Sequence, residues 1–472
     1  MDEPTFGYLT ADRSGLFTDR YELTMLRGYR EADHTPTATF SLYFRDLPPN
    51  RGYVIAAGLE QAVAAIQNVT FGEQARSYLR REGFPAAFVE SLADFEFTGD
   101  VRAVPEGTAV FPNEPLLEVT APIDEAQLFE TILINQVGFQ SLIATKAARM
   151  RDVVRRQGDD QTLVDFGSRR AHGTDAGIKA ARAAYVGGVD GTSNDAAGDL
   201  FDIPVFGTMA HSWVQSFPSE RAAFEAFVDV YGEDSVLLID TYDTVSGAET
   251  ALDVAQETGV DIRGVRLDSG DLSALSQAVR DRLPESMDVF VSSGVDEYFL
   301  RDFFADGGVA DGFGPGTALT TSTDAPTLNP VYKLVAVEVN GEMRPSMKLS
   351  TGKVSYPGAK QIHRFTDDDG THRDLLARAD EVVGSQDAGL GAVHVHDGSG
   401  RELLVDVIDD GELVYDPPSL SESRDRTIRT LERLPTAVRA LEDPGAYPVE
   451  VSDGLAAETE RLESELRSEM GL

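Results

Sequence analysis

Seven loops between residues 166 and 317 hold side chains whose types can do chemistry. Each loop follows a short β-branched run, and together the loops contain guanidinium, imidazole, hydroxyl and carboxylate side chains as well as glycines. In a parallel βα fold such loops meet on one rim, so we expect them to form one site. The candidates are Phe166, Arg169, Arg170, His172, Ser193, Thr208, His211, Asp240, Arg266, Asp268, Ser292, Ser293, Gly294, Asp296, Gly314, Gly316 and Thr317.

These residue types indicate a phosphorylated sugar as the ligand. Glycines beside Ser or Thr, in SSG and in GFGPGT, expose backbone N–H groups that can cradle phosphate. Arginine forks suit carboxylate or phosphate, and Asp suits Mg²⁺ or ribose hydroxyls. Group transfer from such a sugar passes through an oxocarbenium-like state, which needs anions near the ring and cations at the leaving group. The loops supply both kinds of group.

A βα repeat from about Gln161 to Thr321 must position these loops. Helical patterns, with Thr174 or Asp175 and Asp271 as expected N-caps, separate the strand-like runs. Seven such units predict a parallel barrel, irregular because their spacing varies. The runs are TLVDF, VGGVD, IPVFG, VLLID, IRGVRLD, DVFVSSG and VADGFG.

The remaining sequence predicts two further lobes. Strand-like stretches before residue 120 surround helices, such as the helix expected after Gly58, and β-rich sequence returns after Pro330. The predicted fold class is therefore α/β, an irregular parallel α/β barrel with an α+β N-terminal lobe completed by a β-rich C-terminal return. The expected domains are residues 1–119, 120–330 and 331–472, the last ending in acidic helices.

Composition excludes several classes of protein. The 472 residues hold 41 Lys and Arg against 80 Asp and Glu, a net charge of −39 that disfavours nucleic acid or anionic membranes as partners. There is no Cys, which excludes thiolate and disulfide chemistry. No apolar run would span a bilayer, and acidic Asp2 and Glu3 differ from a secretory signal, so we expect a cytoplasmic protein.

The acidic, Lys-poor surface also predicts adaptation to high salt, although an acidic protein of low-salt origin is an alternative. Four of the six lysines, Lys333, Lys348, Lys353 and Lys360, lie close together in the sequence. An anion site and ordinary solvated strand faces are both compatible with that concentration.

Long motifs in a constant order resemble the nicotinate phosphoribosyltransferases. They include TDRYELTM, LPPNRGYVIAAGLE, GSRRAHG, GGVDGTSN, GTMAHSW, LLIDTYDT, VRLDSGDL, SSGVDEY, DGFGPGT and YKLV, from about Thr18 to Gln361. The resemblance implies a type II phosphoribosyltransferase fold and a head-to-tail homodimer with shared active sites. It also implies nicotinate, 5-phosphoribosyl 1-pyrophosphate and ATP as substrates, with Mg²⁺ and ATP as cofactors.

The resemblance assigns a role to each matching residue. His211 matches a histidine that ATP phosphorylates, and Asp268 and Arg266 complete the catalytic set. Tyr21, from the partner subunit, and Phe166 match the aromatic pair around the pyridine ring. The other expected substrate-binding residues are Arg169, Arg170, Ser193, Thr208, Asp296, Ser292, Ser293, Gly294, Gly314, Gly316 and Thr317. No residue is assigned as a metal ligand.

Ser193 favours nicotinate over nicotinamide, since the related nicotinamide enzymes place an Asp there and a Ser does not repel a carboxylate. Nicotinamide, quinolinate and a catalytically silent nucleotide sensor remain alternatives. Tyr21 and Phe166 are alternatively core aromatics. His394 and His396 lack a third ligand and are interpreted as part of an exposed strand.

Overall fold

A computed structural model describes residues 9–349, 355–366, 372–383 and 400–470. Lys353, His394 and His396 lie outside these ranges. The chain divides into two compact units, one formed by Met1–Thr145 with Thr327–Leu472 and the other by Lys146–Pro326. We call them the first unit and the second unit. The second unit is continuous in sequence, whereas the first combines both ends of the chain.

An antiparallel sheet forms the centre of the first unit, in the order β13-β12-β1-β5-β3-β17-β18. The N-terminal strand β1 pairs with the later strand β12, and β3 pairs with β17, so segments from both ends of the chain share this sheet. The strands are β1 Thr37–Tyr43, β3 Asp100–Ala103, β5 Leu117–Pro122, β12 Val331–Val339, β13 Glu342–Pro345, β17 Val405–Asp409 and β18 Glu412–Leu413.

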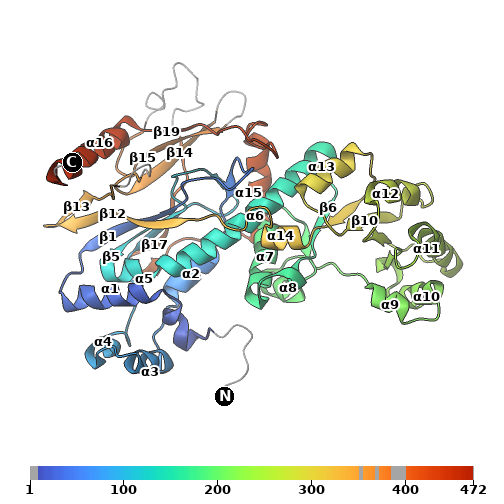
Figure 1. Ribbon diagram of the computed structural model, residues 1–472, viewed down its shortest axis with the longest axis horizontal. Coiled ribbons are helices and arrows are strands. Elements are labelled where there is room, and N and C mark those ends of the chain that lie inside the picture. The colour runs from blue at the N-terminus through green and yellow to red at the C-terminus, as the bar shows by residue number, and fades with distance from the viewer. Residues whose placement is uncertain (1–8, 350–354, 367–371, 384–399, 471–472) are drawn as a thin grey trace. The chain divides into compact units, whose positions relative to one another are not determined.

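A four-stranded sheet, β16-β14-β15-β19, and a β2-β4 pair complete the strands of this unit. Their bounds are β2 Val54–Ile55, β4 Ala109–Val110, β14 Lys360–Thr366, β15 His372–Arg378, β16 Arg401–Glu402 and β19 Val449–Val451. The helices are α1 Arg20–Glu31, α2 Leu59–Gln67, α3 Glu73–Arg81, α4 Ala86–Ser91, α5 Ile123–Leu128, α15 Leu420–Arg433 and α16 Asp453–Met470, with a 3-10 helix at Ala11–Leu16. Helix α6, Glu130–Gln157, begins in this unit and ends in the second. In Figure 1, α1 and α5 lie beside β1 and β5, and α16 lies beside β15.

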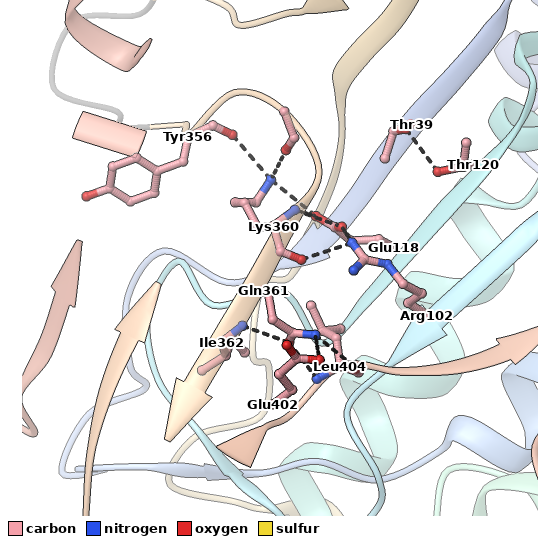
Figure 2. A network of polar contacts seen from close by, with 11 residues as sticks. Thr39, Arg102, Glu118, Thr120, Tyr356, Lys360, Gln361, Ile362, Glu402 and Leu404 are labelled. Atoms are coloured by element: carbon pink, nitrogen blue, oxygen red, sulfur yellow. Dashed lines mark hydrogen bonds and ion pairs between the residues drawn. The ribbon is translucent and has the colours of Figure 1, made fainter. Parts of the chain in front are cut away.

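A buried ion pair fixes the start of β14 within the first unit (Figure 2). Lys360 is 2% exposed, its Nζ lies 3.2 Å from Oε1 of Glu118, and it donates to the carbonyls of Tyr356 and Gly358. Arg102 donates to the other Glu118 oxygen over 2.7 Å. Burial lowers the pKa of Lys360, although Glu118 acts to raise it. Lys360 thus binds a carboxylate of its own chain, and Lys333 likewise lies 3.6 Å from Glu130.

A parallel sheet forms the second unit, in the order β7-β6-β11-β10-β9-β8. Its strands are β6 Thr162–Asp165, β7 Gly191–Thr192, β8 Val236–Leu238, β9 Gly264–Leu267, β10 Asp288–Ser292 and β11 Gly312–Gly314. Its helices are α7 Thr174–Val186, α8 Asp195–Phe201, α9 His211–Gln215, α10 Glu220–Tyr231, α11 Thr244–Thr258, α12 Leu272–Arg280, α13 Glu297–Ala305 and α14 Thr317–Thr321, with 3-10 turns at Ser168–Arg170 and Gly232–Asp234. The α/β class and the parallel sheet are confirmed, and closure into a barrel stays a prediction.

Two of the expected strands differ in the structure. Val186 ends helix α7, and the strand that should cover VGGVD begins only at Gly191. IPVFG forms a single parallel bridge, between Val205 and Thr192. Because Gly187 and Gly188 form a helix-ending turn, with Gly188 at φ 111°, the first of these runs cannot start extended.

Among the described residues, no helix is long and apolar enough to cross a membrane.

Candidate active site

His211 lies between a hydroxyl and a carboxylate in the second unit. It is the first residue of α9, its Nδ1 is 3.1 Å from Oγ1 of Thr241, and its Nε2 is 3.9 Å from Oδ2 of Asp268. The imidazole is 39% exposed. The hydroxyl of Thr241 therefore orients the ring through one nitrogen and leaves Nε2, beside Asp268, open to a ligand.

Asp268 connects the loops that follow three neighbouring strands, β8, β9 and β10. Ser292 donates its hydroxyl to Oδ1 of Asp268 over 2.6 Å. The N–H of Asp268 and the hydroxyl of Ser269 both donate to Oδ2 of Asp240, over 3.1 and 2.5 Å. The other oxygen of Asp240 is buried and has no hydrogen-bond partner in the described part of the chain, so a ligand can still occupy it.

Arg266 brings a buried cation to the same loops. It extends from β9, its Nη2 donates to the carbonyl of Met209 over 3.0 Å, and its buried Nε has no partner among the described residues. Burial lowers the pKa of Arg266 and nearby Arg169 lowers it further, while Asp268 and Asp240 act to raise it. Two guanidinium groups close enough to repel each other favour an anion between them.

Phe166 follows β6 and lies against the glycines of β11 and its loop. Its N–H donates to the carbonyl of Pro315 over 2.8 Å. A Cβ at Gly314 would overlap the ring of Phe166, whereas a Cβ at Gly316 would touch its backbone at ordinary distance. Glycine at position 314 therefore leaves the space that this half-buried ring occupies.

The expected phosphate loops differ in their geometry. Ser293 and Gly294 both have positive φ, 75° and 68°, and a non-glycine residue in that region marks a strained turn of the kind found at ligand sites. Asp296 caps α13 by accepting from the N–H of Phe299 over 2.7 Å, so one of its oxygens is already engaged. Gly316 and Thr317 begin the short helix α14.

The other candidates of the second unit also have defined places. Thr208 donates its hydroxyl to the carbonyl of Val236 over 2.5 Å, which holds its loop to β8. The side chains of Arg169, Arg170, His172 and Ser193 are exposed at the loops after β6 and β7. No contact among the described residues fixes a role for His172.

Tyr21 belongs to the first unit. It lies in the first turn of α1 and is 45% exposed. Burial raises the pKa of its hydroxyl well above the usual range, and the carboxylates of Glu130 and Glu22 raise it further. Its place beside a pyridine ring stays a prediction.

The sequence interpretation omitted two acidic residues beside this site. Asp165 is buried at the end of β6 and accepts hydrogen bonds from neighbouring loops. Glu220 begins α10, and burial followed by the charges of Asp243 and Asp240 raises its pKa to about 7. An acidic residue inside the apolar run TLVDF was the available signal for Asp165, whereas the sequence held no signal for Glu220.

Within the described ranges, no group of three or more His, Cys, Asp or Glu residues is arranged to hold a metal ion.

Family comparisons cover nearly the whole chain. The N-terminal domain of nicotinate phosphoribosyltransferase matches residues 16–138, the nicotinate phosphoribosyltransferase family matches residues 161–375, and its C-terminal domain matches residues 359–458. A nicotinate phosphoribosyltransferase of Mycobacterium tuberculosis is 44% identical over 95% of this chain and 93% of its own. The nicotinate phosphoribosyltransferase of Bacillus subtilis is 38% identical over 94% of both chains.

A solved structure agrees with these relatives. The crystal structure of human nicotinic acid phosphoribosyltransferase is 30% identical, covers 94% of this chain and 99% of its own, and superposes with a TM-score of 0.80. The resemblance seen in the sequence motifs is thereby confirmed. The chain belongs to the nicotinate phosphoribosyltransferase family and is an enzyme of that family.

Proposed function

We propose that this enzyme joins nicotinate to 5-phosphoribosyl 1-pyrophosphate, giving nicotinate mononucleotide and pyrophosphate for NAD biosynthesis. We propose further that ATP hydrolysis drives the reaction through phosphorylation of His211. The family membership supports the transfer reaction. The observation that carries the ATP coupling is the position of His211 between Thr241 and Asp268, with Nε2 open.

The geometry defines which nitrogen of His211 acts. For Nε2 to attack the γ-phosphorus of ATP, Nδ1 must carry the ring proton and donate it to Oγ1 of Thr241. The bond between the γ-phosphorus and the bridging oxygen breaks, ADP leaves, and water later releases phosphate from the histidine. Asp268 lies on the Nε2 side, 3.9 Å from that nitrogen, where Mg²⁺ held by its carboxylate would offset the repulsion between this carboxylate and the anionic phosphoryl group.

The transfer step needs a pyridine nitrogen aligned with the anomeric carbon of the ribose. In our proposal, Phe166 lies along the pyridine ring, and Arg266 and Arg169 bind the carboxylate and the phosphates. The pyridine nitrogen forms a bond to the anomeric carbon while the bond between that carbon and the pyrophosphate oxygen breaks. Anionic Asp268 then favours the developing oxocarbenium charge.

Mg²⁺ fits this set of residues. The ion is usually held by one or two carboxylates together with substrate phosphates. Asp240 offers a buried oxygen without a partner in the described structure, and Asp268 lies next to it. Mg²⁺ would neutralise the charge of the leaving pyrophosphate.

We also infer a cytoplasmic homodimer whose barrel rims share residues, with Tyr21 reaching the partner's pyridine slot. An exposed aromatic ring in the first turn of α1 is suited to contact a second copy. Mixed dimers of Tyr21→Ala and His211→Ala chains test this sharing, because only a shared site regains activity on mixing.

The decisive assay measures nucleotide formation from nicotinate and 5-phosphoribosyl 1-pyrophosphate with Mg²⁺ in high salt, with and without ATP. The parent should form product faster with ATP, and His211→Ala should lose that stimulation. His34→Ala, which changes an exposed histidine of the first unit, is the matched control and should keep it. Phosphate attached to the parent and absent from His211→Ala would identify the residue directly.

The other substrates distinguish the alternatives. If nicotinamide or quinolinate reacts and nicotinate does not, the substrate assignment is wrong. If ligands bind and none of these substrates reacts, the proposed transfer reaction is wrong and binding alone, as in a nucleotide sensor, takes its place. Ser193→Asp should weaken nicotinate binding at least about tenfold, because it adds a negative charge beside a carboxylate, while Ser193→Asn should change it less.

A further inference from the structure

Asp165 is a buried carboxylate whose hydrogen bonds all lead to active-site loops. It ends strand β6 and is 1% exposed. Its Oδ1 accepts from the N–H of Gly167 over 2.8 Å and from Oγ1 of Thr320 over 3.4 Å. Its Oδ2 accepts from Oγ1 of Thr192 over 2.9 Å, and its carbonyl accepts from the N–H of Ser193, also over 2.9 Å. We call these five residues the Asp165 junction.

The partners of Asp165 come from three different segments. Gly167 directly follows Phe166, whose ring forms the expected pyridine slot. Thr192 ends β7 and precedes Ser193. Thr320 lies in α14, which begins with Thr317. One carboxylate thus connects the ring slot, the loop that distinguishes carboxylate from amide, and a phosphate loop.

Two of these segments, the loop after β6 and helix α14, lie so close together that only a glycine fits at position 167. A Cβ added at Gly167 would overlap the side chain of Thr320, so the loop after β6 lies directly against α14. The N–H of Phe166 also donates to the carbonyl of Pro315. A small displacement of either segment would therefore be passed to the other.

Burying the carboxylate of Asp165 is unfavourable for the stability of the fold, so stability does not explain its presence. Burial raises its pKa, and the bonds from Gly167, Thr192 and Thr320 counteract that rise. The contacts recorded for Asp165 in the described structure include no cation, although buried charges are usually paired. A residue that costs stability and orients three ligand-binding loops is typical of support for a functional site.

We infer that Asp165 is the positioning residue that sets the pyridine slot and the phosphate loop at a fixed distance from each other. This inference rests on the proposed function for the identity of the two substrates. Asp165 touches neither substrate and acts through Gly167, Ser193 and Thr320. Its removal must therefore affect both substrates together, whereas loss of one partner affects one substrate.

Four substitutions test this inference. Asp165→Asn keeps the shape, turns an acceptor into a donor that faces donors, and should raise KM for both nicotinate and 5-phosphoribosyl 1-pyrophosphate about tenfold, with a lower kcat. Thr192→Val should raise mainly the nicotinate KM, and Thr320→Val mainly that of the phosphorylated sugar, each by about threefold. Thr192→Ser, which restores the hydroxyl, should return the nicotinate KM towards the parent value.

Asp190→Asn is the matched control. Asp190 accepts a hydrogen bond over 2.8 Å from the N–H of Leu163, which lies in β6 like Asp165. It also forms an ion pair with Arg151. It precedes β7, at the end of the strands away from the loops. Asp190→Asn should lower the melting temperature and leave both KM values within about twofold of the parent.

Hydrogen exchange separates failure of this inference from failure of the proposed function, because it needs no substrate. Amides of residues 166–170 and of Ser193 should exchange at least about tenfold faster in Asp165→Asn and not in Asp190→Asn. Unchanged exchange in a folded Asp165→Asn protein, or KM changes confined to one substrate, would overturn the positioning role. A parent enzyme that is inactive on nicotinate, with exchange altered as expected, would overturn only the proposed substrates.

Discussion

At Gly314 the absence of a side chain decides where the ring of Phe166 lies. Because a Cβ there would overlap that ring, Gly314→Ala must push Phe166 out of its position. We expect a five- to tenfold rise in the nicotinate KM, roughly the worth of one aromatic contact, with a smaller change for the phosphorylated sugar. Steady-state kinetics with each substrate varied in turn measures this difference.

The control for this substitution is Gly28→Ala on helix α1. A Cβ at Gly28 meets nothing within 4 Å, and alanine favours a helix, so activity and stability should be kept. An unchanged nicotinate KM in Gly314→Ala would show that Phe166 does not form the pyridine slot.

Glu22 should make stability depend on pH near neutrality. Burial raises its pKa, hydrogen bonds from Thr131 lower it and the charge of Glu130 raises it, with a net pKa of about 7. Because the folded-state pKa exceeds the unfolded value near 4.5, the folded protein binds more protons between these two values. The contribution of Glu22 to the free energy of unfolding is therefore present below about pH 4.5 and is lost as the pH rises through about 7.

Glu22→Gln should remove this dependence while keeping an acceptor for Thr131. Urea unfolding at pH 5 and pH 8 in constant high salt should show the parent losing about 1 to 3 kcal/mol more than the variant over that range. Glu31→Gln, on the exposed end of the same helix, should behave like the parent. Equal losses in Glu22→Gln and parent would contradict the assignment.

The sequence predicted the polar residues at the ends of most strands but missed Asp165, which ends β6, and Glu220, which begins α10. His211 and Asp268 were found because polar side chains follow strand-like runs at that rim. Asp165 lies inside such a run, where one charged letter does not show whether a strand ends or a loop begins. Asp296 was assigned to ligand binding, but its contact with Phe299 also makes it an N-cap, and the letters do not separate these two uses.

Among the elements, β14 depends on the ion pair between Lys360 and Glu118 (Figure 2). Lys360→Met leaves the buried Glu118 with Arg102 as its remaining cation and removes the hydrogen bonds of Lys360 to two carbonyls, so it should cost about 2 kcal/mol of unfolding free energy. The double variant Lys360→Met with Glu118→Gln should lose less unfolding free energy than the two single variants together, by about 1 kcal/mol or more. Denaturant unfolding of the four proteins completes this cycle.

An exposed pair supplies the comparison. Arg461→Met breaks the contact of Arg461 with Glu465 on α16 and should change stability by no more than about 0.5 kcal/mol. If Lys360→Met costs as little, the pair does not anchor β14.

Element boundaries followed the sequence where local chemistry was decisive. Asp271 caps α12 as expected, by accepting from the N–H of Ala274. Helix α7 instead has Gly173 as its N-cap, with no side-chain bond, so the expected cap at Thr174 or Asp175 was wrong. Gly173 stands directly before this helix with a φ of 129°, a backbone conformation that the types of the neighbouring side chains do not reveal.

For the whole molecule, the sequence predicted that a β-rich C-terminal return completes the N-terminal lobe, but it did not give the strands that pair. The sheet of the first unit joins β1 to β12 and β3 to β17, across about 300 residues of chain. Local periodicity predicts each strand, but it contains no information about which partner a strand selects. The sequence predicted a continuous domain over residues 120–330, and the contacts give the continuous second unit as Lys146–Pro326.

The net charge of −39 also acts on the whole molecule, and its cations are shared. The single guanidinium of Arg221, for example, lies within ion-pair distance of three carboxylates, those of Glu225, Asp253 and Glu257. Since the chain has 41 Lys and Arg for 80 Asp and Glu, nearly half of the acidic residues lack a cation of their own even if every cation pairs once. Repulsion between them favours the unfolded chain unless salt screens it.

Stability should therefore rise steeply with salt. The screening length falls from about 10 Å at 0.1 M to about 3 Å at 1 M, which is shorter than most distances between surface charges. We expect the melting temperature to rise by about 10 °C or more between 0.1 and 2 M KCl, measured by calorimetry. Sucrose at matched osmolality stabilises by exclusion without screening and should give a much smaller rise. A melting temperature independent of KCl, or equally raised by sucrose, would show that charge repulsion does not limit this fold.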